Sequence, residues 1–345
     1  MSTASKSLTV LRFGPTRFAQ SAWNDLISNY HVKVVESEAH NREEFLKELR
    51  SGKFADVDCV TRTFESVKKT GLVDKELISE LKKYTQIKVL SHNGAGYDQV
   101  DAVSCGEQGI QVSNVIGLVD AATADTHIYL LLSALRNFQL STINMRDGKW
   151  PTAKCGGTPI GHDPEGKTLG ILGMGGIGRA IRDRMKPFDL NKIIYHNRHQ
   201  LSSELEGDAE FCPTKKELFE QADIISISVP LNGHTQHMIN KDTISQMKDG
   251  VVIINTARGA IVNEPDLIDA LKSGKVASFG SDVWENEPNP DSQLYMLPNV
   301  VALPHMGTHT FETMKAMEEY VVKNVVHYIE TGRVLAMVPE LKHKF

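Results

Sequence analysis

Three short segments in the second half of the chain carry an arginine, a glutamate and a histidine that could act together on a carbonyl compound. Arg258 lies in Asn-Thr-Ala-Arg-Gly, Glu287 directly precedes a proline, and His305 lies in Pro-His-Met-Gly. Arginine can bind a carboxylate through two parallel hydrogen bonds. Histidine can donate a proton to an alkoxide, and a neighbouring carboxylate favours its charged form. These residue types therefore indicate reduction of an acid that carries a carbonyl group.

Taken singly, each of these side chains has an ordinary structural explanation. A histidine after a strand is often structural, an arginine can tie a loop, and a glutamate in a turn is often solvated. Each of the three segments, however, begins just past the end of a predicted strand. Ligands bind at the carboxyl ends of the strands in an open parallel sheet. Their joint placement therefore favours one shared site.

A glycine motif in the same half of the chain predicts a dinucleotide site. Gly173, Gly175 and Gly178 form G-x-G-x-x-G between the predicted strand Thr168–Leu172 and the predicted helix Gly176–Met185. The first glycine permits a tight turn, the second lets the backbone approach a pyrophosphate, and the third lets the helix pack on the strand. The start of the helix then offers N–H groups to the phosphates. In this context the motif is a strong sign of nucleotide binding.

The end of the next predicted strand indicates which cofactor is bound. An NAD-binding chain would place an acid there, about 20 residues after the motif. This chain has Asn197, 19 residues after the last glycine, followed by Arg198. The pattern predicts NADPH as the preferred cofactor and NADH as the alternative, because a guanidinium can pair with a 2′-phosphate. A solvated loop arginine is the other explanation. The neighbouring His196 and His199 lack further ligands, so no metal is expected.

The composition excludes several other classes of protein. The 345 residues are 41% hydrophobic and 23% charged, which is ordinary for globular proteins, and the net charge of −5 argues against a nucleic-acid partner. No apolar run approaches the ~20 residues that a membrane helix needs. The four cysteines are widely separated, which indicates neither a zinc site nor a disulfide framework. Residues 1–6 are polar, and we expect a cytoplasmic protein.

The elements that must position these residues alternate between short β-branched runs and helical patterns, which is typical of a parallel α/β fold. The sequence predicts two doubly wound parallel-sheet domains, a flavodoxin-like domain for substrate and a Rossmann domain for cofactor. We expect the substrate domain to take residues 1–118 and the cofactor domain 119–309. Residues 310–345 would return to the substrate domain as a final helix and tail. Five strands are predicted in the first sheet and six in the second.

Between the two series lies the longest helical pattern in the chain, Asp120–Arg146, which is predicted as one continuous helix. It is too apolar for a solvated linker. Its pattern alone leaves two interpretations open, a core helix and a helix at a subunit interface.

On these motifs the chain resembles the D-isomer-specific 2-hydroxyacid dehydrogenases along nearly its whole length, and within them the fungal glyoxylate/hydroxypyruvate reductases. The spacing of 29 residues from Arg258 to Glu287, and of 18 from Glu287 to His305, is similar to that of the family's catalytic triad. The resemblance implies that Arg258 binds the substrate carboxylate and carbonyl. It also implies that His305 is the acid/base and that Glu287 is its partner.

The resemblance implies further contacts that the residues alone do not show. The backbone N–H groups of Ala95 and Gly96 would hold the substrate carboxylate, and the helix near Thr123–Asn137 would form a homodimer. The remaining cofactor contacts implied are Gly176 and Ile177 at the pyrophosphate, and Val229, Thr256, Ala257 and Asp282 towards the adenosine and nicotinamide ends.

The expected function is therefore NADPH-dependent reduction of a small 2-oxo acid, glyoxylate or hydroxypyruvate, to the 2-hydroxy acid. Two alternatives remain open. One is a D-2-hydroxyacid dehydrogenase for larger 2-oxo acids, because the sequence does not show the size of the pocket. The other, from a different class, is a nucleotide-sensing interaction protein like the corepressor relatives of this fold.

Overall fold

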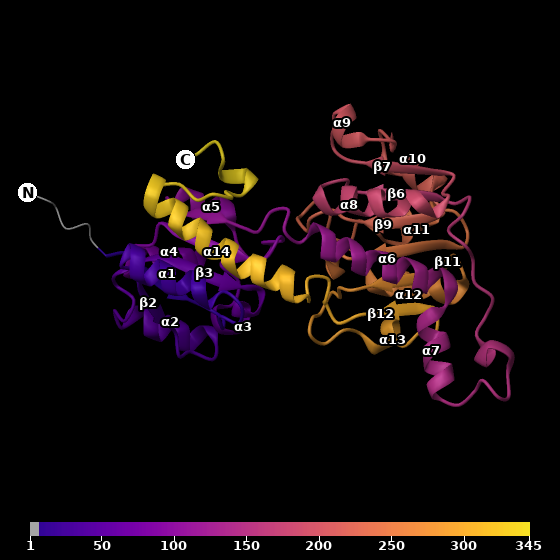
Figure 1. The fold of residues 1–345 in the computed structure, drawn as a ribbon, viewed down its shortest axis with the longest axis horizontal. Coiled ribbons are helices and arrows are strands. Elements are labelled where there is room, and N and C mark those ends of the chain that lie inside the picture. The colour runs from indigo at the N-terminus through magenta and orange to yellow at the C-terminus, as the bar shows by residue number, and fades with distance from the viewer. Residues whose placement is uncertain (1–6) are drawn as a thin grey trace, which may run out of the picture. The chain divides into compact units, whose positions relative to one another are not determined.

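The computed structural model describes residues 7–345, and the polar start of the chain, 1–6, lies outside the described residues. The chain divides into two compact units (Figure 1). One unit consists of the described part of Met1–Val119 together with Thr310–Phe345, and the other consists of Asp120–His309. Among residues 7–345, no helix combines the length and the apolar character that a membrane span requires.

The first unit is built on a sheet of five parallel strands. In the order β2-β1-β3-β4-β5, it has the arrangement of a flavodoxin-like doubly wound fold. Its strands are β1 (Thr9–Arg12), β2 (Lys33–Glu36), β3 (Val57–Thr63), β4 (Val89–Asn93) and β5 (Gln111–Ser113). The central strands β3 and β4 are buried along most of their length because helices cover both faces of the sheet.

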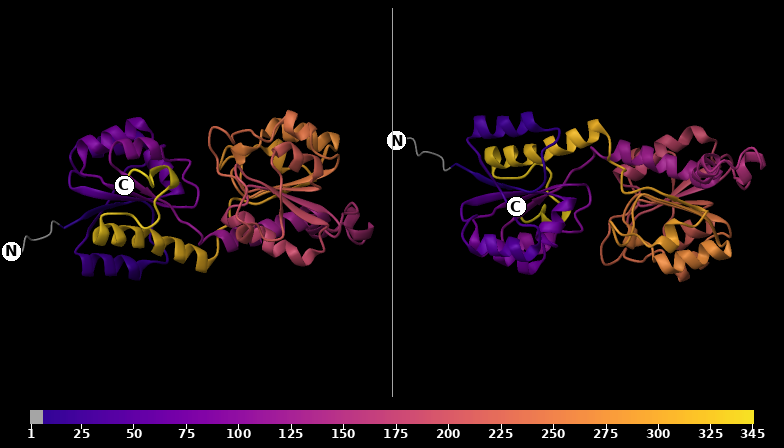
Figure 2. Two further views of the ribbon diagram at one scale, coloured as in Figure 1. Left: turned by 90° about the horizontal axis from the view of Figure 1, so that it is seen from above. Right: turned by 90° about the horizontal axis from the view of Figure 1, so that it is seen from below.

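Helices form two layers around this sheet (Figure 2). Its helices are α1 (Gln20–Tyr30), α2 (Arg42–Arg50), α3 (Val67–Thr70), α4 (Lys75–Tyr84), α5 (Ala102–Glu107) and α14 (Phe311–Thr331). Helices α1 and α14 lie side by side on one face, whereas α2, α4 and α5 contact one another in turn on the other. The C-terminal helix therefore completes one wall of the first unit.

A single carboxylate joins α14 to the start of α1. Ala19, the residue before α1, has no side chain that could cap the helix. The Glu318 carboxylate accepts hydrogen bonds instead from the backbone N–H groups of Arg17, Phe18 and Ala19, at 3.1, 2.8 and 3.0 Å. These donors belong to the turn that enters the helix, where N–H groups lack helical acceptors. Glu318, near the end of the chain, thus stabilises the start of α1, near its beginning.

The second unit is built on a sheet of seven parallel strands in the order β12-β11-β10-β9-β6-β7-β8, which is the Rossmann arrangement. Its strands are β6 (Thr168–Leu172), β7 (Lys192–His196), β8 (Glu210–Phe211), β9 (Ile224–Ile227), β10 (Val251–Asn255), β11 (Val276–Ser281) and β12 (Val300–Ala302). The prediction of six strands missed β8. Two residues are too few to show an alternating pattern.

Two separate apolar cores flank this sheet. Helices α6 (Asp120–Arg136) and α8 (Gly176–Met185) pack on one face, and α10 (Lys215–Gln221), α11 (Lys241–Ser245) and α12 (Glu264–Ser273) pack on the other. Short helices α9 (Ser203–Glu206) and α13 (Ser292–Tyr295) complete the unit. The doubly wound class that the sequence predicted is confirmed in both units.

The prediction of one continuous helix over Asp120–Arg146 was wrong. The segment forms α6 and then α7 (Phe138–Arg146), separated at Asn137. Asn137 has φ 55° and ψ 31°, a left-handed conformation that cannot continue the right-handed hydrogen-bond ladder. Asparagine is the side chain after glycine that adopts this conformation most readily, so the break is encoded at this position.

Candidate active site

The three segments singled out in the sequence all follow neighbouring strands of the second sheet. Arg258 comes after β10, Asp282 and then Glu287 come after β11, and His305 comes after β12. These strands are adjacent and parallel, so their carboxyl ends meet at one edge of the sheet. That edge is where open α/β sheets bind ligands.

His305 and Glu287 form a direct pair at this edge. The Nδ1 atom of His305 lies 2.6 Å from Oε2 of Glu287. The other carboxylate oxygen of Glu287 accepts a hydrogen bond from the backbone N–H of Trp284 at 2.9 Å, which fixes the carboxylate. The His305 side chain is 34% exposed and that of Glu287 is 17% exposed, so the ring can meet a ligand while its partner is largely covered. A carboxylate so placed fixes the orientation of the imidazole ring.

The Asp282 carboxylate holds the turn on which His305 lies. Its two oxygens accept hydrogen bonds from the N–H groups of Met306 and Gly307, each at 2.7 Å. His305 itself has φ 54°, which is uncommon for a residue other than glycine and needs such support. Burial raises the pKa of Asp282, although these two hydrogen bonds oppose the shift. The sequence pointed to Asp282 only as a cofactor contact, and its contact with this turn was not foreseen.

Arg258 lies in a segment that packs directly on the turn carrying Glu287. The Asn255 side chain donates to the Arg258 carbonyl at 2.9 Å and accepts from Ala257 N–H at 3.0 Å, which fixes the loop. The Arg258 guanidinium donates to the Ala257 carbonyl at 2.7 Å. A Cβ atom on Gly259 would overlap the backbone of Trp284, so the two segments can meet only because residue 259 is glycine.

Two carboxylates and two histidines that the sequence did not single out support these segments. His237 Nε2 lies 2.7 Å from Glu285 Oε1, and the N–H of Glu285 donates to the buried Glu264 carboxylate at 2.9 Å. Burial raises the pKa of Glu264. On the other face of the sheet, His127 Nδ1 lies 3.1 Å from the Thr256 hydroxyl. Burial lowers the pKa of His127 to about 3, so the ring is neutral at physiological pH.

The glycine motif has the geometry that a pyrophosphate requires. Gly173 has φ 96° and lies beside Val229, and a Cβ on Gly178 would overlap the Gly173 carbonyl. By contrast, apart from its two chain neighbours, no atom of residues 7–345 lies within 4 Å of the Cβ position of Gly175, so this side of the loop is open. The first helical hydrogen bond of α8 runs from Arg179 N–H to the Gly175 carbonyl. The N–H groups of residues 176–178, Ile177 among them, therefore point out of the helix start and fit a dinucleotide.

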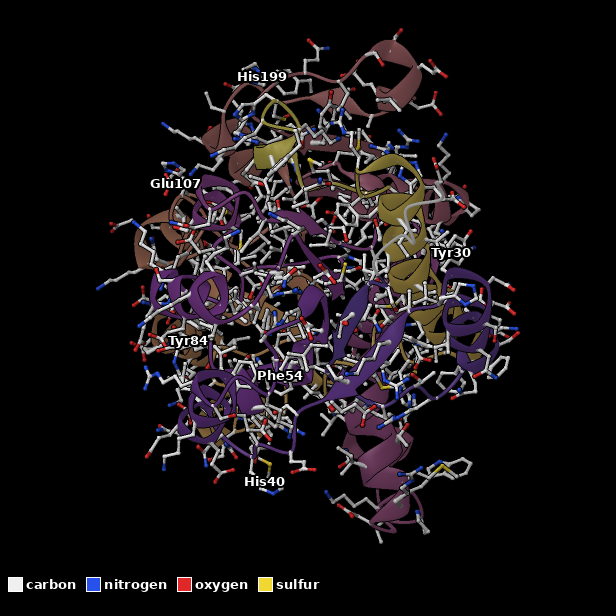
Figure 3. All side chains as sticks on the ribbon, turned by 90° about the vertical axis from the view of Figure 1, so that its left-hand side faces the viewer. Tyr30, His40, Phe54, Tyr84, Glu107 and His199 are labelled. Carbon is white, nitrogen blue, oxygen red and sulfur yellow. The ribbon has the colours of Figure 1, made fainter. Side chains whose placement is uncertain are left out.

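At the end of β7, Asn197 contacts the glycine loop and Arg198 does not. The Asn197 side-chain oxygen accepts a hydrogen bond from Met174 N–H at 2.8 Å. Arg198 and His199 are exposed, and His199 is labelled in Figure 3. In the part of the chain that the structure describes, no side chain pairs with the Arg198 guanidinium. The cation next to the glycine loop is therefore available to a ligand.

In the first unit, the loop after β4 offers backbone donors. Two side chains fix the carbonyl groups of this loop. The Asn114 side chain donates to the Ala95 carbonyl at 2.7 Å, and His92 Nε2 lies 2.9 Å from the Gly96 carbonyl. The N–H groups of Ala95 and Gly96 have no acceptor among residues 7–345. Two N–H groups presented by a fixed loop suit an anion such as a carboxylate.

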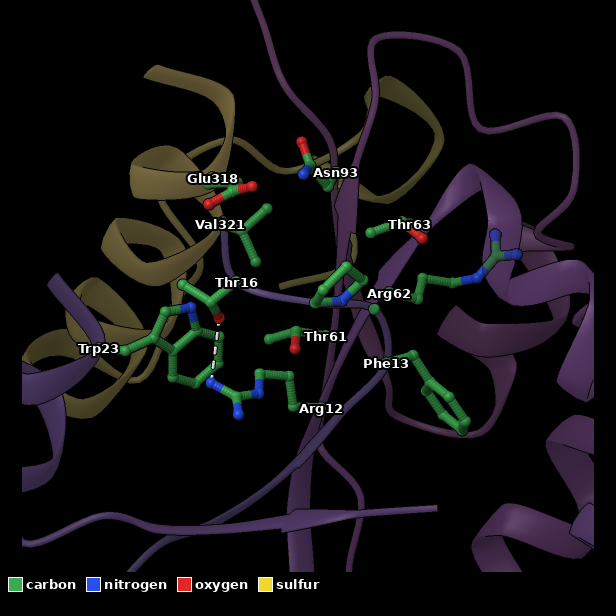
Figure 4. A pocket seen from close by; sticks show the side chains of 12 residues that line it. Arg12, Phe13, Thr16, Trp23, Thr61, Arg62, Thr63, Asn93, Glu318 and Val321 are labelled. Carbon is green, nitrogen blue, oxygen red and sulfur yellow. Dashed lines mark hydrogen bonds between the residues drawn. The ribbon is translucent and has the colours of Figure 1, made fainter. Parts of the chain in front are cut away.

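A small polar pocket lies at the carboxyl ends of β1, β3 and β4 in the same unit (Figure 4). Arg12 donates to the Thr16 hydroxyl at 3.0 Å and pairs with Glu36. The Glu318 carboxylate that lines the pocket caps α1. Arg12 and Glu318 are thus already partnered, whereas the buried Arg62 guanidinium donates to Gln99 through one nitrogen. We assign no ligand to this pocket.

Comparison with known proteins matches the second unit to one enzyme family. The model for the NAD binding domain of D-isomer specific 2-hydroxyacid dehydrogenases matches residues 128–307. Glyoxylate reductase 1 of Saccharomyces cerevisiae is 48% identical over 344 residues, which cover 99% of this chain and 97% of that protein. The 4-methyl-2-oxopentanoate reductase A of Aspergillus oryzae is 43% identical and covers 98% of this chain and 99% of its own.

Solved structures of similar chains extend the match to both units. A glyoxylate reductase from Paecilomyes thermophila has a TM-score of 0.92 at 45% identity, over 98% of this chain and 100% of that one. An NADPH-dependent glyoxylate/hydroxypyruvate reductase from Sinorhizobium meliloti, solved with NADP and malonate, has a TM-score of 0.82 at 29% identity. That match covers 96% of this chain and 97% of that one.

Proposed function

The chain belongs to the family of D-isomer specific 2-hydroxyacid dehydrogenases and is an NAD(P)-dependent oxidoreductase of 2-oxo acids, and on that basis we propose that it reduces glyoxylate or hydroxypyruvate with NADPH. The high identity to the yeast glyoxylate reductase supports this choice of substrate. The observation that carries the proposal is the His305–Glu287 pair, 2.6 Å apart, at the sheet edge that also bears the glycine motif.

In this proposal each residue of the pair has a defined task. When bound at the glycine motif, the cofactor would supply the hydride that the carbonyl carbon accepts. His305 donates the proton that the carbonyl oxygen requires, and Glu287 orients the ring. Asp282 holds the backbone of residues 306 and 307, so the ring stays in place as it loses its proton.

Substrate binding in the second unit is proposed to depend on Arg258. The Arg258 guanidinium would form two parallel hydrogen bonds to the substrate carboxylate and polarise the neighbouring carbonyl. A short 2-oxo acid offers both groups that the guanidinium recognises. In the first unit, the N–H groups of Ala95 and Gly96 are proposed separately as carboxylate donors.

Turnover of a panel of 2-oxo acids tests the substrate. We expect kcat/KM for glyoxylate and hydroxypyruvate to exceed that for 4-methyl-2-oxopentanoate. The Aspergillus relative favours a second candidate, reduction of a branched 2-oxo acid. If 4-methyl-2-oxopentanoate has the highest kcat/KM of the panel, this second candidate replaces glyoxylate as the proposed substrate.

The exposed Arg198 predicts a preference for NADPH over NADH of about 10- to 100-fold in kcat/KM. A charge-assisted hydrogen bond to the 2′-phosphate contributes roughly 1.5–3 kcal/mol, and NADH lacks that phosphate. Arg198→Ala should remove most of the preference by weakening NADPH and leave NADH nearly unchanged. Arg333→Ala, which replaces an exposed arginine in the other unit, is the matched control. Equal kcat/KM for the two cofactors in the wild type would contradict the assignment.

The second unit is proposed to form a homodimer through α6 and α7. Several large apolar side chains are exposed there although most of α6 is buried, namely Tyr129, Phe138, Ile143 and Met145. Burying such a patch against a second copy removes it from water, and twofold dimers are the commonest closed assemblies. Sedimentation at micromolar concentration should give about twice the chain mass of 38.2 kDa. Ile143→Asp should shift the protein towards the monomer, and a monomeric wild type would refute the dimer.

A further inference from the structure

The end of β7 holds the glycine loop at two successive N–H groups. Gly173 N–H donates to the His196 carbonyl at 3.0 Å, and Met174 N–H donates to the Asn197 side-chain oxygen at 2.8 Å. The first of these contacts is made by the backbone and any residue could make it. The second depends on the side chain at position 197.

These two bonds divide the donors of the loop into two groups. The N–H groups of Gly173 and Met174 are used inside the protein, and the Met174 side chain is fully buried. The N–H groups of residues 176–178 precede the first helical acceptor and remain for a ligand. Fixing the N–H groups of Gly173 and Met174 determines where those of residues 176–178 point, because only Gly175 lies between the two sets.

The chemistry of the acceptor at position 197 matters as much as its presence. An amide oxygen can accept the Met174 N–H without bringing a charge next to the 2′ position of a bound adenosine ribose. A carboxylate would accept the same hydrogen bond and would also repel a 2′-phosphate. Alanine would leave the N–H without a protein acceptor.

We propose that Asn197 is a positioning residue for the glycine loop, whose side-chain oxygen orients the pyrophosphate-binding N–H groups before either cofactor arrives. The proposal rests on the binding of a dinucleotide at this motif but not on the preference for NADPH. Asn197 therefore acts on both cofactors through Met174, whereas Arg198 acts only on the one that carries a 2′-phosphate.

Three variants separate the two roles when NADH and NADPH are titrated by fluorescence without any 2-oxo acid. Asn197→Ala should weaken both cofactors by a similar factor, about 5- to 10-fold, the usual size of one lost hydrogen bond. Asn197→Asp should keep the affinity for NADH and weaken only NADPH. Asn191→Ala, which replaces an exposed asparagine at the opposite end of β7, should change neither dissociation constant.

Amide hydrogen exchange at Met174 in the cofactor-free enzyme gives an independent readout. Exchange should accelerate in Asn197→Ala and stay slow in Asn197→Asp and in Asn191→Ala, all of which should retain the wild-type fold by circular dichroism. If Asn197→Ala binds NADH with the wild-type dissociation constant, or leaves exchange at Met174 unchanged, the proposal is overturned. If the wild type binds both cofactors equally, the NADPH assignment fails but a common loss in Asn197→Ala still supports the positioning role.

Discussion

Replacing His305 by alanine should slow the reduction of glyoxylate by about 10²- to 10⁴-fold, the usual contribution of a placed general acid. The loss should appear in kcat, because the ring acts on the proton and the carboxylate of the substrate is bound by other groups. Dissociation constants for NADPH should stay near the wild-type value. Steady-state kinetics and a separate cofactor titration measure the two effects.

The Glu287→Gln variant tests whether the two side chains act as a pair. The amide can still contact Nδ1 of His305, but it lacks the negative charge of the carboxylate. We expect kcat for glyoxylate to fall below the wild-type value, while the dissociation constant for NADPH stays unchanged. A wild-type kcat in Glu287→Gln would show that His305 does not depend on the Glu287 carboxylate.

The second large effect is expected at Arg258. Arg258→Gln removes the two-pronged contact to the substrate carboxylate, a loss of about 2–4 kcal/mol in transition-state binding, or roughly 30- to 900-fold in kcat/KM. NADPH affinity should barely change. Arg258→Lys is the informative comparison, because it keeps the charge but loses the planar pair of donors. It should recover only part of the activity.

Wild-type turnover and KM for glyoxylate in Arg258→Gln would show that another group binds the carboxylate. In that case the N–H groups of Ala95 and Gly96 become the candidates. These are backbone groups and cannot be replaced directly. The next variant to assay would be Asn114→Ala, which removes the side chain that donates to the Ala95 carbonyl.

The motif positions could be predicted from the sequence because they stand at strand ends. A parallel sheet gathers the residues that follow its strands at one edge, so recognising the strands before Arg258 and His305 was enough to expect their common edge. The glycine motif was also predictable, because each glycine is required by local sterics and the motif lies between a predicted strand and a predicted helix.

What the sequence did not reveal depends on contacts between distant segments. The contact from Met174 N–H to Asn197 spans 23 residues, and that from Asp282 to Gly307 spans 25. The spacing of apolar residues along the sequence does not predict such contacts. The break at Asn137 was missed for a different reason. The apolar pattern continues through this position, but a single residue in the left-handed conformation interrupts the helical hydrogen bonds.

The contact of Glu318 with the turn at Arg17–Ala19 has a consequence for synthesis on the ribosome. The chain leaves the ribosome from its N-terminus, and domains generally fold as units. The second unit has all its residues once His309 has emerged, whereas the first still lacks α14, the helix that covers one face of its sheet and caps α1. The part of the protein made first is therefore the part completed last, and until α14 arrives one face of its sheet is covered by α1 alone and depends on chaperones for protection from aggregation.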